Sequence, residues 1–227
     1  MADAGCDRDG SGCDCDSGPS IGARIGAHFD SKVERAGPGA GSSLHATTQS
    51  LVGLLGDPTD RTVLELGCGR GSLMLELLRA GAAGTSGVDL SGASIERARE
   101  RFAASGLADR ATLTLGDGAE AALDAADWVV LDRVICCYPD ADKLLANSIP
   151  AARRRYAFSV PNSRGWRGLA ARVGRRLDNG LNGLCRRSCT TFVHDLDRID
   201  RTLRSAGFEL SASATRGLWY VAVYDRA

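Results

Sequence analysis

The sequence predicts an α/β protein built on a doubly wound sheet of seven strands, mostly parallel, with an antiparallel C-terminal hairpin strand. Three observations predict this fold class. From Thr62 onward, short apolar strand patterns alternate with amphipathic helical patterns. The first strand runs into a glycine-rich turn, "TVLELGCGRGS". The last two strand patterns are joined only by "TRG", a spacing typical of a β-hairpin.

Composition shifts divide the chain into three parts. Residues 1–20 consist mainly of Gly, Asp, Ser and Cys with almost no apolar side chain, so we expect a disordered tail. Residues 21–60 carry helical patterns and are expected to form an N-terminal helical segment. Residues 61–227 are expected to form the main domain, with an insertion at 161–192.

Periodicity and capping residues predict the individual elements in chain order. A loose helix is expected at Ile21–Val33, and a second helix that Ser42 or Ser43 can cap and that Gly56 ends. Ser91 and Asp140 are predicted caps further along the chain. Strands are expected at 63–66, 85–91, 111–117, 127–132, 155–161, 208–214 and 218–224, and helices at 72–79, 92–105, 139–149 and 195–206.

Charge and cysteine usage narrow the class of protein. The formal net charge is zero, so bulk charge does not predict nucleic-acid binding. No apolar run reaches the roughly 20 residues of a membrane span, and no secretory signal is visible, so we expect a cytoplasmic enzyme without stable membrane insertion. The eight cysteines match no standard zinc spacing, which favours packing thiols over a metal or redox site.

Glycine-rich turns between a strand and a helix bind dinucleotides, phosphates and sulfonium cofactors alike, and two details bear on which ligand this one holds. A dinucleotide fingerprint reads G-x-G-x-x-G, whereas Gly67, Gly69 and Gly71 place the third glycine one residue early. Glu65 lies in the strand just before the turn, where a carboxylate would repel a pyrophosphate and attract an ammonium group. The glycine spacing and Glu65 therefore disfavour a Rossmann NAD(P)-dependent oxidoreductase, which remains as an alternative function.

The turn "ELGCGRG" resembles motif I of the class I S-adenosylmethionine (SAM)-dependent methyltransferases, whose fold is Rossmann-like. In that family an acid at the position of Asp89, in "GVDLS", binds the ribose hydroxyls. An acid at the position of Asp117, in "LGDG", lies near the adenine amino group. The segment "DWVVLDRV" and the closing hairpin also match, so that the resemblance extends from Thr62 to Arg226.

The resemblance implies that SAM is the cofactor and that the helical segment 21–60 covers its site. It also implies a set of cofactor-binding residues: Glu65, Gly67, Gly69, Gly71, Asp89, Leu90, Asp117, Gly118 and Asp132. A catalytically silent SAM-binding regulatory module is the second alternative.

The methyl acceptor is expected to be a small molecule that meets the segment "LDRVICCYPD". There Asp132, Arg133, Cys136, Cys137 and Tyr138 could face it, with packing as the alternative for the two cysteines. The stretches "YPD", "FSVP" and "FDS" resemble the magnesium-protoporphyrin O-methyltransferase subgroup, which implies carboxylate O-methylation of porphyrin type as one candidate reaction.

Which residues take part in catalysis depends on the chemical group that accepts the methyl. A carboxylate is nucleophilic at neutral pH and needs alignment rather than a general base. A phenol or an amine needs help with its proton, and His28, Tyr138 and His194 are then the candidates.

The insertion 161–192 carries seven arginines against one acid, Asp178. One interpretation is a lid that guides an anionic acceptor, with Arg164 or Arg167 binding its carboxylate. A solvated arginine-rich face is the alternative, and a helix on a membrane surface is a weaker third one.

Overall fold

The computed structural model describes residues 20–36, 44–165, 174 and 191–227. The strands are β1 (Thr62–Leu66), β2 (Gly84–Asp89), β3 (Ala111–Leu115), β4 (Ala126–Asp132), β5 (Ala152–Pro161), β6 (Phe208–Arg216) and β7 (Trp219–Arg226). The α-helices are α1 (Ile21–Ala36), α2 (Ala46–Leu55), α3 (Ser72–Arg79), α4 (Gly92–Ala104), α5 (Ala141–Ser148) and α7 (Leu196–Ser205). Short 3₁₀ helices are η1 (Ala108–Arg110), η2 (Ile135–Cys137) and η3 (Ile149–Ala151).

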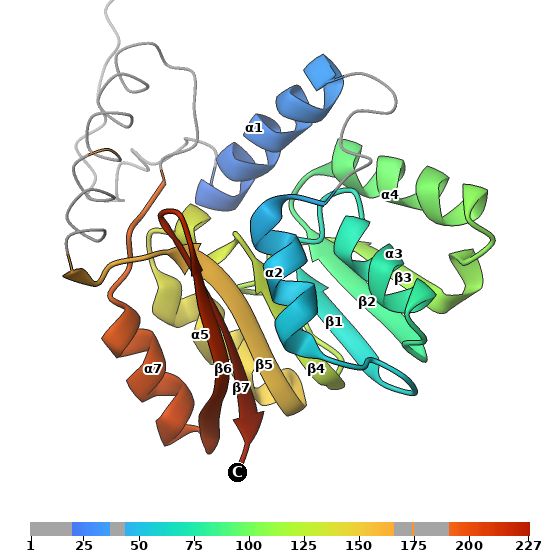
Figure 1. Ribbon diagram of the computed structural model, residues 1–227. Helices are drawn as coiled ribbons and strands as arrows, with labels where there is room; N and C mark the ends of the chain where they lie inside the picture. Colours follow the sequence, from blue (N-terminus) through green and yellow to red (C-terminus); the bar gives the residue numbers. More distant parts are fainter. Residues whose placement is uncertain (1–19, 37–43, 166–173, 175–190) are drawn as a thin grey trace, which may run out of the picture.

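The seven strands form one sheet in the order β3-β2-β1-β4-β5-β7-β6 (Figure 1). Neighbours among β1 to β5 are parallel, whereas β7 pairs antiparallel with both β5 and β6. The predicted fold class, with its antiparallel hairpin strand, is confirmed. The strand order reverses between β1 and β4, and ligands of such sheets bind at the carboxyl ends of the strands beside this point.

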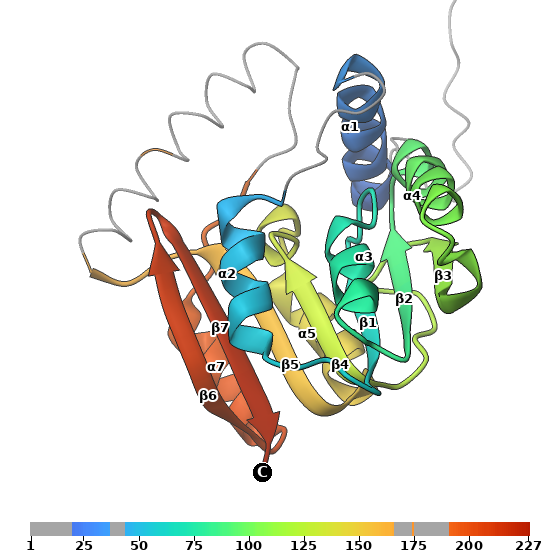
Figure 2. The same ribbon diagram turned by 45° about the vertical axis from the view of Figure 1, so that its right-hand side comes forward.

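Helices cover both faces of the sheet (Figure 2). One face packs against α2, α3 and α4, and the other packs against α5 and α7. The side chains of β4 alternate between the two cores: Trp128 and Val130 face the first, Val129 and Leu131 the second. This period of two is the pattern of a strand buried on both sides. The helix α1 lies outside both layers, above the carboxyl ends of the parallel strands (Figures 1 and 2).

Two local expectations need correction. The helix α2 is capped by His45, whose Nδ1 accepts the Thr47 amide at 3.3 Å, and not by Ser42 or Ser43, which lie outside the described residues. In the hairpin, Leu218 belongs to the turn rather than to a strand, because Arg216 still pairs with Trp219. Ser91 and Asp140 cap α4 and α5 as expected, accepting amides at 3.0 and 3.1 Å.

Arg155 ties the centre of the sheet to its antiparallel end. Its Nε and Nη2 donate to the two carboxylate oxygens of Asp225 on β7, at 2.6 and 3.0 Å. Its Nη1 donates to the Leu55 carbonyl of α2, and the guanidinium lies 5.1 Å from the ring centre of Trp128 on β4. A single side chain therefore contacts three other elements.

We predict that Arg155→Met lowers the free energy of unfolding by about 1 to 3 kcal/mol, since hydrogen bonds between charged groups are lost in a part-buried position. Arg154→Met is the matched control, because Arg154 is the exposed neighbour on the same strand. Urea unfolding followed by circular dichroism measures both variants. Equal midpoints for the two variants would show that the Arg155 contacts do not stabilise the fold.

Candidate functional site

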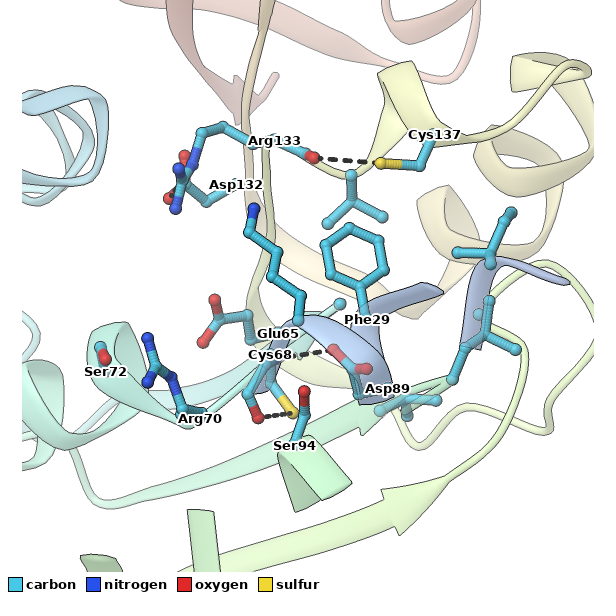
Figure 3. Close-up of a pocket in the computed structure, with 18 of the residues that line it drawn as sticks. Phe29, Glu65, Cys68, Arg70, Ser72, Asp89, Ser94, Asp132, Arg133 and Cys137 are labelled. Carbon is cyan, nitrogen blue, oxygen red and sulfur yellow. Dashed lines mark hydrogen bonds and ion pairs between the residues drawn. The ribbon is translucent and has the colours of Figure 1, made fainter. Parts of the chain in front are cut away.

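A cavity of about 640 Å³ opens at the carboxyl ends of β1, β2 and β4. This volume lies within the range of about 300 to 1,000 Å³ that small-molecule sites occupy. Its lining includes the turn after β1, the end of β2, the segment after β4, and residues of α1 and α2. Figure 3 shows Glu65, Asp89 and Asp132 around this pocket.

The turn after β1 is held by the carboxylate of Asp89. Its Oδ2 accepts the Gly69 amide at 2.7 Å and its Oδ1 accepts the Ser91 amide at 2.8 Å. Gly67 and Gly69 have φ of +66° and +52°, in the left-handed region that glycine adopts without strain. A Cβ on Gly67 would lie 2.3 Å from the Val134 side chain, whereas a Cβ on Gly69 would meet nothing within 4 Å. The backbone therefore borders the cavity directly.

Glu65 is a buried carboxylate that lines this pocket, with a relative exposure of 4%. The Met74 amide donates to it, but its Oε2 has no hydrogen-bond partner among the described residues. Burial first, and then the nearby Asp132 and Asp89, raise the pKa of Glu65 well above its ordinary value. A cation in the pocket would provide the missing partner and favour the charged form of the carboxylate.

Asp132 is the last residue of β4, and Arg133 follows it. Thr48 of α2 and Ser159 of β5 each donate a hydroxyl to the Asp132 carboxylate. Nε of Arg133 lies 3.6 Å from the same carboxylate. The backbone of Arg133 is left-handed, with φ of +61°, and its amide donates to Oγ of Ser159 at 2.9 Å. Both side chains line the pocket, as do Cys136 and Cys137.

Tyr138 lines the pocket, but its hydroxyl is engaged. It donates to Oδ1 of Asp117 at 2.8 Å. Burial and this carboxylate raise the pKa of Tyr138, so that the phenol stays protonated at neutral pH. The geometry therefore argues against Tyr138 as a general base and makes it a support for Asp117. Asp117 itself and Gly71 do not line the pocket, in contrast to the other expected cofactor residues.

The histidines differ from the sequence-based expectation. His194 is absent from the pocket lining, and its Nε2 donates towards the carbonyls of Tyr138 and Ile135 at 2.9 and 3.1 Å. His28 packs edge-on against Phe29 and also does not line the pocket. Burial lowers the pKa of both imidazoles. His45, which sequence reasoning did not single out, is the histidine that lines it.

One face of α1 forms part of the pocket wall. Its lining residues are Ile25, Phe29, Lys32, Val33 and Ala36. They are spaced by about one helical turn, a pattern that predicted the helix, whereas its position over the cofactor site was an expectation from the family resemblance. Trp219, at the start of β7, also lines the pocket and was not expected there.

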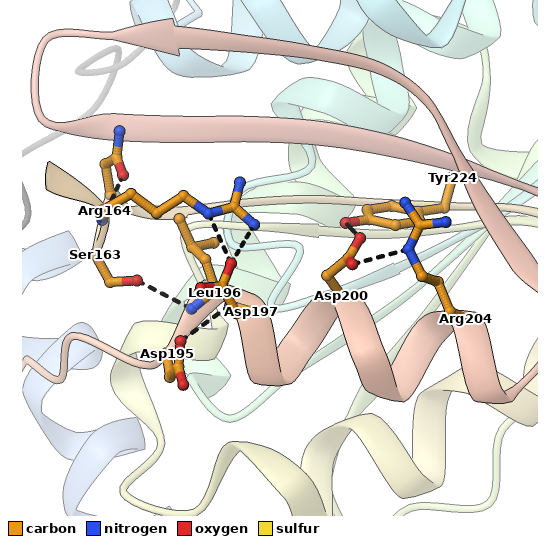
Figure 4. Close-up of polar contacts among 9 residues, drawn as sticks. Ser163, Arg164, Asp195, Leu196, Asp197, Asp200, Arg204 and Tyr224 are labelled. Carbon is orange, nitrogen blue, oxygen red and sulfur yellow. Dashed lines mark hydrogen bonds and ion pairs between the residues drawn. The ribbon is translucent and has the colours of Figure 1, made fainter.

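Arg164 forms an ion pair with α7 and is absent from the pocket lining. Its Nε and Nη2 donate to Oδ1 of Asp197 at 2.9 and 2.7 Å (Figure 4). Its guanidinium lies 5.4 Å from the ring centre of Tyr220. Arg164 thus joins the end of β5 to α7, and its binding of a substrate carboxylate stays a prediction. Arg167 and most of the arginine-rich insertion lie outside the described residues.

The described cysteines, Cys68, Cys136 and Cys137, are reduced thiols that line the pocket. Burial raises the pKa of Cys68 well above its ordinary value, so its thiolate is disfavoured. In the part of the chain that the structure describes, no cluster of three or more His, Cys, Asp or Glu side chains could hold a metal ion. Within the same ranges, no helix is both long and apolar enough to cross a membrane.

Comparison with known families finds a match over part of the chain. Residues 63–153 match the sequence model of the family described as "Methyltransferase domain". The ribosomal protein L11 methyltransferase of Escherichia coli O8 (strain IAI1) is 36% identical over 77 residues, covering 33% of this chain and 26% of the relative. The enzyme of the same name from Haemophilus ducreyi is 38% identical over 89 residues, covering 37% and 30%. The chain thus spans less than a third of the length of these curated relatives.

Solved structures match over much more of the chain. Magnesium protoporphyrin IX methyltransferase (ChlM) from Synechocystis PCC 6803, with bound SAH (S-adenosylhomocysteine), superposes with a TM-score of 0.71 at 20% identity, covering 92% of this chain and 100% of that one. Geranyl diphosphate C-methyltransferase from Streptomyces coelicolor A3(2) gives a TM-score of 0.68 at 14% identity, covering 94% and 100%. At such identities the likeness shows the fold.

The predicted resemblance to class I SAM-dependent methyltransferases is confirmed: residues 63–153 match the sequence model described as "Methyltransferase domain", and the fold is that of solved methyltransferases. SAM is the cofactor of the class. The residues present fit it: the unpartnered Oε2 of Glu65 suits an ammonium group, and the open backbone at Gly69 leaves room beside it.

We predict that Glu65→Gln stabilises the ligand-free chain at pH 8. Because the pKa of Glu65 is raised on folding, its contribution is fully present below the unfolded pKa of about 4.3 and is lost as the pH rises through the folded pKa. Glutamine does not titrate, so the variant does not lose this stability as the pH rises. Melting temperatures at pH 5 and pH 8 should therefore show the advantage of the variant growing with pH. Glu76→Gln, in α3 and part-exposed, is the control and should show no such trend.

Proposed function

We propose that this chain transfers a methyl group from SAM to an anionic small-molecule acceptor. The observation that carries the proposal is the buried carboxylate of Glu65 beside the glycine turn, whose Oε2 has no hydrogen-bond partner among the described residues, with Asp89 at the end of the neighbouring strand. When bound, SAM supplies an electrophilic methyl group on a sulfonium centre. The domain's family match supports methyl transfer as the reaction class.

The chain's own residues bind and orient the cofactor in this proposal. Glu65 would accept hydrogen bonds from its ammonium group, and Asp89 would bind the ribose hydroxyls with the lone pairs that the Gly69 and Ser91 amides leave unused. Asp117, held by Tyr138, would stand near the adenine amino group. Asp132 is aligned by Thr48 and Ser159 and completes the acidic side of the pocket.

The acceptor side of the pocket combines charge with apolar surface. Lys32 of α1 and Arg133 supply cations, while Phe29 and Trp219 supply aromatic rings. An acceptor with a carboxylate on an apolar body fits these side chains. A carboxylate also suits a pocket in which Tyr138 stays protonated, because it needs no base. A porphyrin carboxylate is one member of this class, and the "FDS" and "YPD" stretches support it.

The first experiment measures cofactor binding. Titration calorimetry with SAM and SAH should show binding to the wild-type chain and an affinity for SAM about ten- to a hundredfold weaker in Glu65→Gln, since a charge-assisted hydrogen bond contributes roughly 1.5 to 3 kcal/mol. Glu76→Gln should bind like wild type. Wild-type binding without SAH formation from any acceptor in a broad panel would instead indicate a silent SAM-binding module, and absent binding would overturn the proposal.

The second experiment tests the acceptor. The chain has two lysines: Lys32 lines the pocket, and Lys143 pairs with Glu120 at 2.5 Å on the surface. We predict that Lys32→Gln raises KM for a carboxylate acceptor about fivefold, a change of roughly 1 kcal/mol, with SAM affinity nearly unchanged. Lys143→Gln should behave like wild type. The methylation panel should contain porphyrin carboxylates, other apolar carboxylates and their neutral esters. A preference for neutral acceptors would contradict the anionic class.

A further inference from the structure

The helix α1 covers the pocket with few buried contacts of its own. Of its 16 residues, Gly22, Ile25 and Gly26 are buried. Apolar burial at so few positions gives a helix little docking energy, and weakly docked elements open locally at low cost. Polar contacts between α1 and the domain therefore decide how firmly it stays in place.

Asp30 makes such a contact with the first turn of α4. Its Oδ1 accepts the Ala93 amide at 3.0 Å and the Ser91 hydroxyl at 2.6 Å. The same Ser91 hydroxyl oxygen accepts the Ser94 amide at 3.0 Å. A carboxylate at a helix N-terminus satisfies amides that have no partner inside the helix and interacts favourably with the helix dipole.

Ser91 connects this contact to the cofactor site. Its backbone amide donates to Oδ1 of Asp89 at 2.8 Å, while its side chain donates to Asp30. The residue that caps α4 is thus bonded both to the carboxylate expected to bind ribose and to the carboxylate of α1. Asp89 lies in the pocket wall, and so does the adjacent Leu90.

The fit of α1 against this region depends on glycine. A Cβ on Gly26 would lie 2.4 Å from the Leu90 carbonyl oxygen, and one on Gly22 would lie 2.8 Å from Oδ2 of Asp117. The Leu90 carbonyl oxygen belongs to the backbone, so no side-chain rotation can move it away from such a Cβ. The helix therefore approaches Leu90 and Asp117 more closely than a helix with side chains at these positions could.

We propose that Asp30 is a positioning residue that fastens α1 over the adenosine end of the cofactor pocket by capping α4. This inference rests on the proposed function. Asp30 holds in place the helix face that carries Ile25, Phe29 and Lys32, and its loss lets α1 leave the pocket. The cofactor in turn stabilises the closed position of α1, because it adds contacts that exist only when α1 is docked.

The test compares Asp30→Ala, Asp30→Asn and the control Glu34→Ala, an exposed acid one turn further along α1. Calorimetry with SAH should give a Kd about tenfold higher for Asp30→Ala, the size of effect that loss of a helix cap produces. Asp30→Asn keeps an acceptor oxygen and should restore affinity to within about threefold of wild type. Limited trypsin cleavage after Arg24, Lys32 and Arg35 should be slowed by SAH in wild type and much less in Asp30→Ala.

A second pair of variants separates docking from helix formation. Gly26→Ala raises the helix propensity of α1 but places a Cβ against the Leu90 carbonyl oxygen, so SAH affinity should fall. Gly53→Ala is the control in α2, because a Cβ there meets nothing within 4 Å. A role of α1 that depended only on its helicity would leave affinity equal or improved in Gly26→Ala.

The outcomes distinguish this inference from the proposed function. If the wild-type chain does not bind SAH, the proposed function fails and the inference fails with it. If wild type binds and both Asp30→Ala and Gly26→Ala bind equally well with unchanged tryptic cleavage, Asp30 does not position α1, while the proposed function stands. Weaker binding by Asp30→Ala that Asp30→Asn restores, with melting temperatures of the domain unchanged, supports the inference.

Discussion

The carboxylate of Asp89 is the interaction on which the architecture of the site depends. It accepts the amides of Gly69, in the turn after β1, and of Ser91, at the start of α4. Two backbone segments that leave neighbouring strands, the turn after β1 and the connection from β2 to α4, are thereby held at fixed spacing before any ligand arrives. Buried backbone amides need such partners, and satisfying them with an ionisable side chain leaves oxygen lone pairs directed at the pocket.

Acidic and basic side chains both line this pocket. Glu65, Asp89 and Asp132 lie close enough that burial and mutual repulsion raise the pKa of Glu65 and burial raises that of Asp89. Holding these acids together costs stability in the ligand-free chain, and a cationic ligand would offset that cost. Lys32 and Arg133 add positive charge to the lining, and Nε of Arg133 lies 3.6 Å from the Asp132 carboxylate.

The alternation of short apolar strand patterns with amphipathic helical patterns was sufficient to predict the sheet. The positions of the residues on either side of the glycine turn were also predictable, since they mark the end of a strand and the start of a helix. That the segment 21–60 covers the site was implied by the family resemblance, but the spacing of Ile25, Phe29 and Val33 alone predicts a buried face without indicating what it packs against. The hydrogen bond between Tyr138 and Asp117 likewise depends on how two loops meet in space, and it turns an expected base into a support.

Arg133 adopts a left-handed backbone that a non-glycine residue takes only at a cost of about 1 to 3 kcal/mol. Its backbone amide donates a hydrogen bond to Oγ of Ser159, and its side chain lines the pocket. An engineer who wished to raise the thermal stability of this protein would find a simple gain here, since glycine would relieve the strain. The same change would remove a guanidinium from the pocket. Under the proposed function, thermal stability and recognition of an anionic acceptor therefore oppose each other at this position, and sequence optimisation for stability alone would remove the arginine.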